Sequence, residues 1–452
     1  MELRINFMKK KGEVIVGRKR FLIVLFAVLT ILMAFTGCAK DETVEINSAE
    51  QEGESAVKGN ITVLTNRTDI VDTVFEDYAK KFNEKYPHVK ISFESFTDYP
   101  GEVKIRMNTK DYGDVLLIPN DVPLQDLPDF FEPLGSVAEL SEKYLFVDEK
   151  AYNQVVYGIP VTINTHGILY NKRVFVDAGI TELPKTPQEY IDAMRKIKEN
   201  TDAIPYYTNY AAGWTMDQWE EHKTAVAGTP DYVNSLPHID DPFSSGRPHY
   251  IVYRLMYDLV KEGLVEKDPM TTDWESSKIG LAKGEIASMV LGSWSIVQVQ
   301  EKAENPEDIG YMPFPYNIDG KRYASSGGDY KIAVSKNSEN KRAARAWLDW
   351  FLSESNFALD QGGISPVIGH EYPSTLKAFK ESGVEFIKNN PPPAGEEGLV
   401  DAIDQEGEIG FMVPDFKRRI IEAALGNRDE TFDDIMEDLN SRWKEARAKV
   451  MK

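Results

Sequence analysis

Cysteine is nearly absent from this sequence. Cys38 is the only one among 452 residues, so the chain cannot form an internal disulfide and has no cysteine-based zinc site. Histidine is also scarce, and the histidines do not stand at the short spacings that metal ligands show. We therefore expect no bound metal. We interpret the histidines as surface or hydrogen-bonded residues: His88, His166, His222, His238, His249 and His370.

Positive charge is in short supply. The chain has 52 Lys and Arg against 73 Asp and Glu, which gives a formal net charge of −21. Proteins bind nucleic acid largely by neutralising its phosphates with Lys and Arg, so this composition argues against a nucleic-acid partner. It also disfavours anionic ligands. We interpret the excess of acidic residues as a feature that keeps the protein soluble.

The sequence also lacks the common catalytic motifs, including the G-x-S-x-G elbow, the P-loop, the dinucleotide-binding G-x-G-x-x-G and the zinc motif H-E-x-x-H. Adjacent acidic residues could in principle supply a glycosidase acid and base, whose carboxyl groups lie roughly 5–10 Å apart. Adjacency in sequence does not create that geometry. We predict solvated surface positions for Glu220-Glu221, Asp240-Asp241 and Glu396-Glu397. The sequence therefore predicts neither an enzyme nor a cofactor.

One uncharged hydrophobic run stands out, at residues 21–35. It is short of the roughly 20 residues that span a membrane, and it follows a strongly basic stretch. The basic residues are Arg4, Lys9, Lys10, Lys11, Arg18, Lys19 and Arg20. This layout predicts a signal peptide over residues 1–37. A plain N-terminal membrane anchor is the alternative.

Residues 35–38, Phe-Thr-Gly-Cys, resemble a bacterial lipobox, in which lipid joins the cysteine sulfur before cleavage on its amino side. Phe35 departs from the leucine that this pattern prefers. The resemblance implies that Cys38 carries a diacylglyceryl group, whose two acyl chains are enough for stable anchoring. The polar residues 38–59 predict a flexible tether. The expected location is the extracellular face of the cell membrane, as in Gram-positive lipoproteins.

The remaining chain is too long for one hydrophobic core, because cores stop growing beyond roughly 250–300 residues. Strand-like runs alternate with helix-like runs, which indicates two α/β lobes with largely parallel sheets. Thr186, Pro187 and Glu189 predict a capped helix start. The predicted strands lie at 61–65, 88–96, 114–118 and 331–335. Further helices are predicted at 69–86, 340–352 and 429–449, and a helix followed by a strand at 273–290.

Aromatic residues gather in polar, loop-like segments. A sugar ring has an apolar C–H face that packs on an indole or phenol, while its hydroxyls bind amide, carboxylate and guanidinium groups. The aromatic candidates are Tyr206, Tyr207, Tyr210, Trp214, Trp219 and Trp294. The polar candidates follow strand ends, where open α/β sheets bind ligands: Asn66, Arg67, Asn120, Asp121, Asp329 and the adjacent Tyr330. Core packing is the alternative for each aromatic, above all for Tyr207 and Trp219.

Four segments carry a family resemblance, and they occur in the order and spacing of that family. They are YGIPVTINTHGILYNKRVFVDAGI from Tyr157, PKTPQEYIDAMRKIK from Pro184, GEIASMVLGSW from Gly284 and GGDYKIAVSKNSENKRAARAWLDWFL from Gly327. Together they resemble the family 1 extracellular solute-binding proteins, the carbohydrate-importer branch that includes maltose-binding protein. The resemblance covers about residues 60–452.

The resemblance implies an α/β fold of the two-lobed periplasmic-binding-protein type II-like kind, with discontinuous lobes joined by hinge crossovers. The crossovers are expected near 162–166, 326–331 and 362–366. The N-terminal lobe would comprise 60–163 and 330–363, and the C-terminal lobe 164–329 and 364–452. By position in the family motifs, the implied ligand contacts are Asn120, Asp121, Asn164, Trp214, Trp294 and Phe411.

The implied function is the capture of a sugar or short oligosaccharide by hinge closure and its delivery to the permease of an ABC importer. The resemblance implies a monomer without a cofactor. Two other classes of function stay open. One is a secreted carbohydrate-active enzyme, which would have catalytic carboxylates in its cleft. The other is a binding protein for a peptide or another polar solute, or a sensor subunit.

Overall fold

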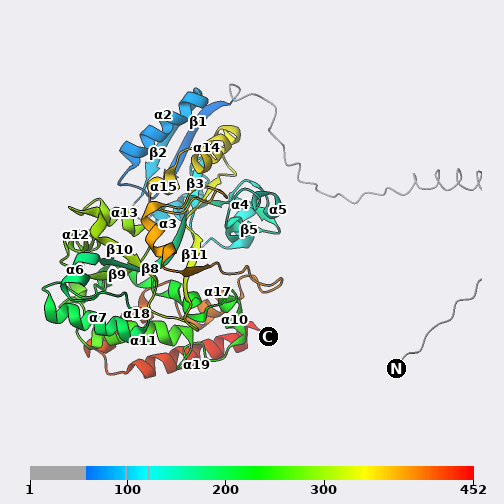
Figure 1. The fold of residues 1–452 in the computed structure, drawn as a ribbon. Coiled ribbons are helices and arrows are strands. Elements are labelled where there is room, and N and C mark those ends of the chain that lie inside the picture. Colours follow the sequence, from blue (N-terminus) through cyan, green and yellow to red (C-terminus); the bar gives the residue numbers. More distant parts are fainter. Residues whose placement is uncertain (1–56, 97–98, 121) are drawn as a thin grey trace, which may run out of the picture. The chain divides into compact units, whose positions relative to one another are not determined.

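The computed structural model describes residues 57–96, 99–120 and 122–452. The predicted signal peptide, Cys38 and nearly all of the predicted tether lie outside the described residues, as does Asp121. Within the described part, the helices are too short or too polar to cross a membrane. Two five-stranded sheets and a smaller three-stranded sheet carry the fold (Figure 1).

The first sheet has the strand order β2-β1-β3-β12-β7. β1 pairs in parallel with β2 and β3. β12 lies between β3 and β7 and is antiparallel to both, although it comes from much later in the chain. The strands predicted in this region are confirmed. Their bounds are β1 (Lys58–Thr65), β2 (His88–Ser95), β3 (Val115–Ile118), β7 (Ile159–Pro160) and β12 (Lys331–Val334).

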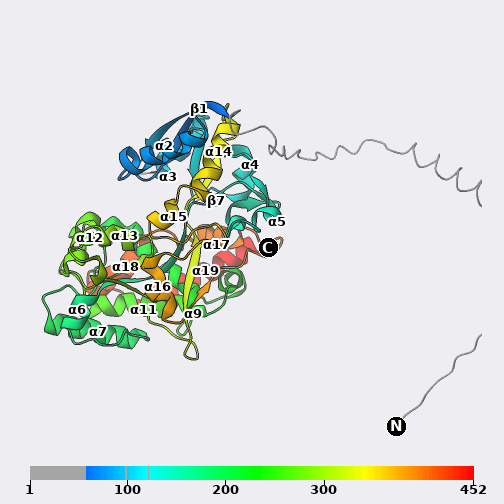
Figure 2. The same cartoon turned by 45° about the horizontal axis from the view of Figure 1, so that its top comes forward.

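The helix predicted over 69–86 forms in two parts. A π-helical turn (Val71–Phe75) leads into α2 (Glu76–Lys85), which ends before Pro87 because proline disfavours helical geometry in the residue before it. Phe82 of α2 packs edge-to-face against Trp347 of α14 (Lys341–Ser353), with ring centroids 5.2 Å apart. α14 also runs beside β1 (Figure 2). These contacts form the core that supports the first sheet.

The second sheet has the order β10-β8-β11-β13, with β9 also paired to β8. The expectation of largely parallel sheets is wrong here. β8 is antiparallel to β9, β10 and β11, whereas β11 and β13 are parallel. Apolar patterning shows that a strand is buried but carries no sign of its direction. The bounds are β8 (Ile163–Asn171), β9 (Ser288–Gly292), β10 (Ile309–Met312), β11 (Arg322–Gly328) and β13 (Val384–Ile387).

Helices α7 (Pro187–Asn200), α11 (Pro248–Lys261), α18 (Asp415–Leu425) and α19 (Phe432–Val450) contribute to the core beside the second sheet (Figure 1). The predicted cap of α7 is confirmed, since the Thr186 hydroxyl accepts from the Glu189 N–H. The Glu189 carboxylate accepts from the Lys185 N–H, one residue before the cap. The predicted amphipathic α19 is confirmed too, and it buries Phe432, Ile435, Met436, Leu439 and Trp443.

Shorter elements complete the described chain. The small sheet consists of β4 (Gly135–Ser136), β5 (Ala151–Tyr152) and β6 (Val155–Val156). The remaining helices are α3 (Tyr99–Thr109), α4 (Leu127–Phe130), α5 (Val137–Leu140), α6 (Lys172–Asp177), α8 (Trp214–Asp217), α9 (Lys223–Ala227), α10 (Tyr232–Ser235), α12 (Trp274–Lys283), α13 (Ser295–Gln300), α15 (Phe357–Asp360), α16 (Lys377–Glu381) and α17 (Leu399–Gly407). α12 and β9 confirm the helix and strand predicted at 273–290.

The segments that carry the chain between the two sheets are hydrogen-bonded to one another. The chain leaves β7 for β8, returns from β11 to β12, and passes between the two cores again after α15. The backbone bonds run from Val161 N–H to Tyr330 O (3.0 Å), from Asp329 N–H to Thr162 O (2.9 Å) and from Ile163 N–H to Ile364 O (2.8 Å). The three segments therefore form one narrow strip, which lies where the family resemblance implies the crossovers.

Candidate functional site

Three indoles meet at one end of the second sheet, and we call them the indole cluster. Trp214 begins α8, Trp274 begins α12, and Trp294 follows the end of β9. The ring centroids are 5.1 Å apart for Trp214 and Trp274, 5.7 Å for Trp214 and Trp294, and 5.8 Å for Trp274 and Trp294. Trp214 is 40% exposed, and the other two are half-buried. The cluster therefore offers aromatic surface to solvent.

A glycine fixes the position of the Trp294 indole. A Cβ atom at Gly292 would lie 2.4 Å from Trp294 Nε1 and 2.6 Å from its Cδ1. The indole thus lies directly over the backbone of Gly292, in the space that any larger residue would fill. The Gly-Ser-Trp sequence, which begins with the last residue of β9, turns the ring back over the strand end.

Asn164 and Asp329 form a polar pair near the crossings. The Asn164 side-chain amide donates to Asp329 Oδ2 at 2.9 Å, and the Tyr330 N–H donates to Asp329 Oδ1 at 2.7 Å. The Ser293 hydroxyl lies 3.4 Å from Asn164 Oδ1, which ties the pair to the turn that carries Trp294. The structure thus brings Asn164, Asp329 and the turn that carries Trp294 into one neighbourhood.

Arg67 lies on the loop that leaves β1. Its guanidinium binds Asp69 through two nitrogens, at 2.9 and 2.7 Å, and donates to Gln361 Oε1 at 2.6 Å. Burial opposes ionisation of Asp69, but the hydrogen bonds and charge of Arg67 outweigh it and lower the pKa of Asp69. The charge of Lys278 on α12 acts in the same direction. Asp69 therefore lies within electrostatic reach of the helix that carries Trp274.

The other polar candidates are less closely placed. Asn66 is half-buried beside Arg67, and Asn120 is exposed after β3. The Asn120 carbonyl accepts from Lys150 Nζ at 3.0 Å, so the backbone of this loop is held by a buried lysine. The Tyr330 ring packs against Tyr99 at the start of α3, with centroids 5.7 Å apart.

Phe411 does not join the indole cluster. It is 6% exposed and packs against His249 and Trp443, with ring centroids 5.2 and 5.6 Å away. Trp219 is a core residue as well, and its Nε1 donates to the Tyr206 hydroxyl at 2.9 Å. A loop position does not tell from sequence whether an aromatic ring points inward. Most of the aromatic residues between 206 and 219 therefore pack in the core beside the second sheet, whereas Trp214 is exposed.

Trp274 was not among the aromatic candidates predicted from the sequence. Asp273 caps α12 by accepting from the Ser276 N–H, and Trp274 is the first residue of that helix. Lys278, one turn later, places its ammonium 5.0 Å from the Trp274 ring centroid. The available signal was a tryptophan directly after a capping aspartate, since such a side chain lies at a helix end where solvent is close.

Two predictions about titratable residues are wrong. Glu220 is 1% exposed instead of solvated, and it pairs with His249 at 3.0 Å and with Lys223 at 3.3 Å. Burial opposes its ionisation, but Lys223 and His249 outweigh burial and lower the pKa of Glu220. His222 is buried, and among the described residues neither of its ring nitrogens has a hydrogen-bond partner. Its ring stacks on Phe314 with centroids 4.6 Å apart, and burial lowers its pKa.

Comparison with known proteins places this geometry in context. The family model described as "Bacterial extracellular solute-binding protein" matches residues 68–356. The chain is 23% identical to the "Multiple sugar-binding protein" of Streptococcus mutans over 294 residues, which are 63% of this chain and 69% of that protein.

Solved structures are more similar. The binding protein BlMnBP1 of an ABC transporter from Bifidobacterium animalis subsp. lactis, in complex with mannobiose, is 36% identical with a TM-score of 0.83. BlMnBP2 from the same organism, a manno-oligosaccharide-specific solute-binding protein in complex with mannotriose, is 34% identical with a TM-score of 0.83. Each match covers 88% of this chain and 96% of the other. These matches confirm the predicted α/β periplasmic-binding-protein fold.

Proposed function

Because this chain belongs to the family of bacterial extracellular solute-binding proteins, we propose that it captures a short oligosaccharide between two lobes and delivers it to the permease of an ABC importer. The family consists of binding proteins, so the prediction that the chain is not an enzyme is confirmed. Transport would be driven by a separate ATPase. No cofactor takes part in this function.

One observation carries the proposal, namely the indole cluster next to the Asn164–Asp329 pair. An indole offers a flat apolar face to the C–H side of a sugar ring. An amide and a carboxylate bind the hydroxyls at the ring edge. A site with both features fits an uncharged saccharide better than a peptide, whose backbone needs rows of donors and acceptors along an extended strand.

The opposite wall of the site is assigned to the first lobe. Asn66, Arg67 and Asn120 follow strands of the first sheet, and this placement supports the assignment. We assign 60–163 with 330–363 to this lobe, and 164–329 with 364–452 to the other. Hinge closure about the hydrogen-bonded crossings would then enclose the sugar between the two walls.

Manno-oligosaccharides are the ligand class to test first. Support comes from the two Bifidobacterium structures, which hold mannobiose and mannotriose. Titration calorimetry of the wild-type protein should give a saturable one-to-one heat with mannobiose or mannotriose. Xylo-, gluco- and chitin-derived oligosaccharides and short peptides complete the panel. Binding of a peptide, or of none of the saccharides, would overturn the proposed function. Preference for another oligosaccharide would change the ligand class alone.

Lipid anchoring through Cys38 is the proposed means of retention at the cell surface. The residue lies outside the described part of the chain, and support comes from the lipobox resemblance. Cys38→Ser should leave the protein unlabelled by a radioactive fatty acid and release it from the membrane or leave its precursor uncleaved. Ser48→Ala in the tether is the matched control and should be labelled like wild type. Fatty-acid label on the Cys38→Ser protein would refute the anchoring proposal.

A further inference from the structure

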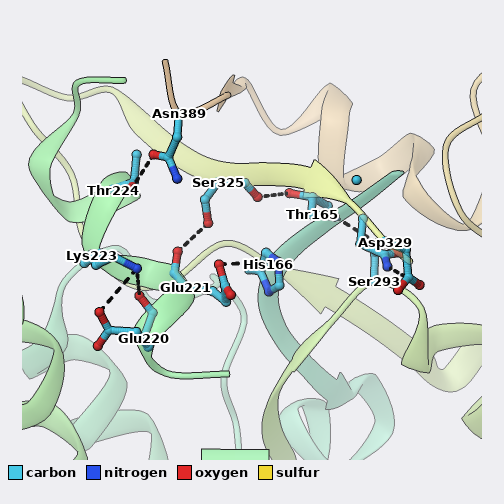
Figure 3. A network of polar contacts seen from close by, with 12 residues as sticks. Thr165, His166, Glu220, Glu221, Lys223, Thr224, Ser293, Ser325, Asp329 and Asn389 are labelled. Carbon is cyan, nitrogen blue, oxygen red and sulfur yellow. Dashed lines mark hydrogen bonds and ion pairs between the residues drawn. The ribbon is translucent and has the colours of Figure 1, made fainter. Parts of the chain in front are cut away.

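His166 lies on β8, two residues after Asn164 of the polar pair. Residues two apart on a strand point to the same face, so His166 shares the face of Asn164 on β8. In the pairing of β8 with β9, His166 is opposite Gly292. Opposite residues of an antiparallel pair also share a face. The Trp294 indole occupies the space where a side chain at Gly292 would lie, so it is on the same face as His166. Figure 3 shows His166 between Glu221 and Asp329.

The gap between His166 and Glu221 has the size of a bridging atom. His166 Nε2 is 3.9 Å from Glu221 Oε2, which is too long for a direct hydrogen bond. A hydroxyl oxygen fits between them at about 2.8 Å from each atom. The two side chains are 15% and 30% exposed, so solvent or a ligand reaches them. The ring's other nitrogen, Nδ1, is buried and has no partner among the described residues.

Neighbouring contacts hold this pair in place. The Glu221 carbonyl accepts from the Ser325 hydroxyl, and Ser325 in turn accepts at its carbonyl from the Thr165 hydroxyl (Figure 3). Glu220, the residue before Glu221, is fixed by its buried ion pairs with Lys223 and His249. A binding group that is already held in position loses little freedom when a ligand arrives.

The charge state of the pair suits an uncharged ligand. Burial lowers the pKa of His166, although the charge of Glu221 opposes this effect. The other charged or titratable groups that act on His166 are Lys223 on α9, Asp329 after β11, and His222, which follows Glu221. A neutral imidazole has one N–H donor, and a carboxylate only accepts. A hydroxyl satisfies both, because it accepts from the Nε2–H and donates to the carboxylate.

We propose that His166 and Glu221 together bind one hydroxyl of the captured sugar and thereby determine which hydroxyl position and configuration the site accepts. This inference rests on the proposed function and assigns two further binding residues to the same site. The indole cluster selects for a sugar ring of any kind, whereas a fixed donor–acceptor pair rejects a ring that lacks the matching hydroxyl.

The test uses mannotriose as the probe and compares variants by titration calorimetry. Glu221→Gln and His166→Ala should each weaken mannotriose binding by about 10- to 100-fold. The double variant should lose less than the product of the two single losses, because the two groups share one hydroxyl. The pair His238 and Glu396, 3.0 Å apart with side chains 52% and 29% exposed, provides matched controls. His238→Ala and Glu396→Gln should bind like wild type.

Monodeoxy analogues of mannotriose distinguish recognition from a structural role. The analogue that lacks the hydroxyl bound by His166 and Glu221 should bind the wild type about 10- to 100-fold more weakly than mannotriose does. The Glu221→Gln variant should bind this analogue nearly as well as it binds mannotriose. The ligand-free melting temperatures should stay near the wild-type value. Unchanged affinity in both variants, or equal losses for all analogues with a lowered melting temperature, would overturn the inference while the proposed function stands. A wild-type protein that binds no saccharide would overturn both.

Discussion

Trp294→Ala is expected to weaken saccharide binding by about 2–4 kcal/mol, which is about 30-fold to 1000-fold. The truncation removes a broad apolar contact, valued at about 25 cal/mol per Å² of buried area. Aromatic packing contributes about 0.5–1.5 kcal/mol beyond that area. The truncation also removes the ring against which Trp214 and Trp274 pack, with ring centroids 5.7 and 5.8 Å from that of Trp294. Titration calorimetry with the bound saccharide measures the loss.

A core tryptophan provides the control for stability. Trp219 is fully buried, so Trp219→Ala should lower the free energy of unfolding by about 3–5 kcal/mol. Trp294 is only half-buried, so Trp294→Ala should lower the free energy of unfolding of the ligand-free protein much less. Gly292→Ala keeps the indole but displaces it, since the new Cβ would lie 2.4 Å from Trp294 Nε1. Full affinity in a Trp294→Ala protein that has lost stability would show that Trp294 is a core residue.

Much of the secondary structure could be predicted because its causes are local. Pro87 stops α2, Thr186 caps α7, and the apolar spacing of α19 matches its buried face. Strand direction could not be predicted, because it depends on how the chain returns to the sheet. β12 illustrates this, since it pairs with β3 after a long excursion through the second sheet.

Some residues of the candidate site could be predicted from the sequence, and others could not. Asp329 and Trp294 could be singled out because a polar and an aromatic residue there lie near predicted strand ends, whereas Asn164 was implied by the family resemblance. Phe411 occupies a comparable loop, but its ring points into the core, which is decided by the packing of helices distant in sequence. The surroundings of His166 depend on its register opposite Gly292, which is also a long-range feature.

Ligand binding is expected to close the two lobes and to stabilise the protein. At a free saccharide concentration 100 times Kd, linkage adds about 2.7 kcal/mol to the free energy of unfolding, because the ligand binds the folded state alone. The melting temperature should therefore rise with saccharide concentration. Closure requires rotation about the strip in which Val161 bonds Tyr330 and Ile163 bonds Ile364. We expect these backbone bonds to hold the crossings together during that rotation.

Small-angle X-ray scattering of the wild-type protein, with and without the saccharide that binds in calorimetry, tests the central claim most directly. We expect the radius of gyration to fall when the site is saturated, because the lobes should rotate toward each other around the sugar. The Trp294→Ala protein should show the same decrease only at much higher saccharide concentration. A radius of gyration that stays unchanged at calorimetric saturation of the wild type would contradict capture by hinge closure.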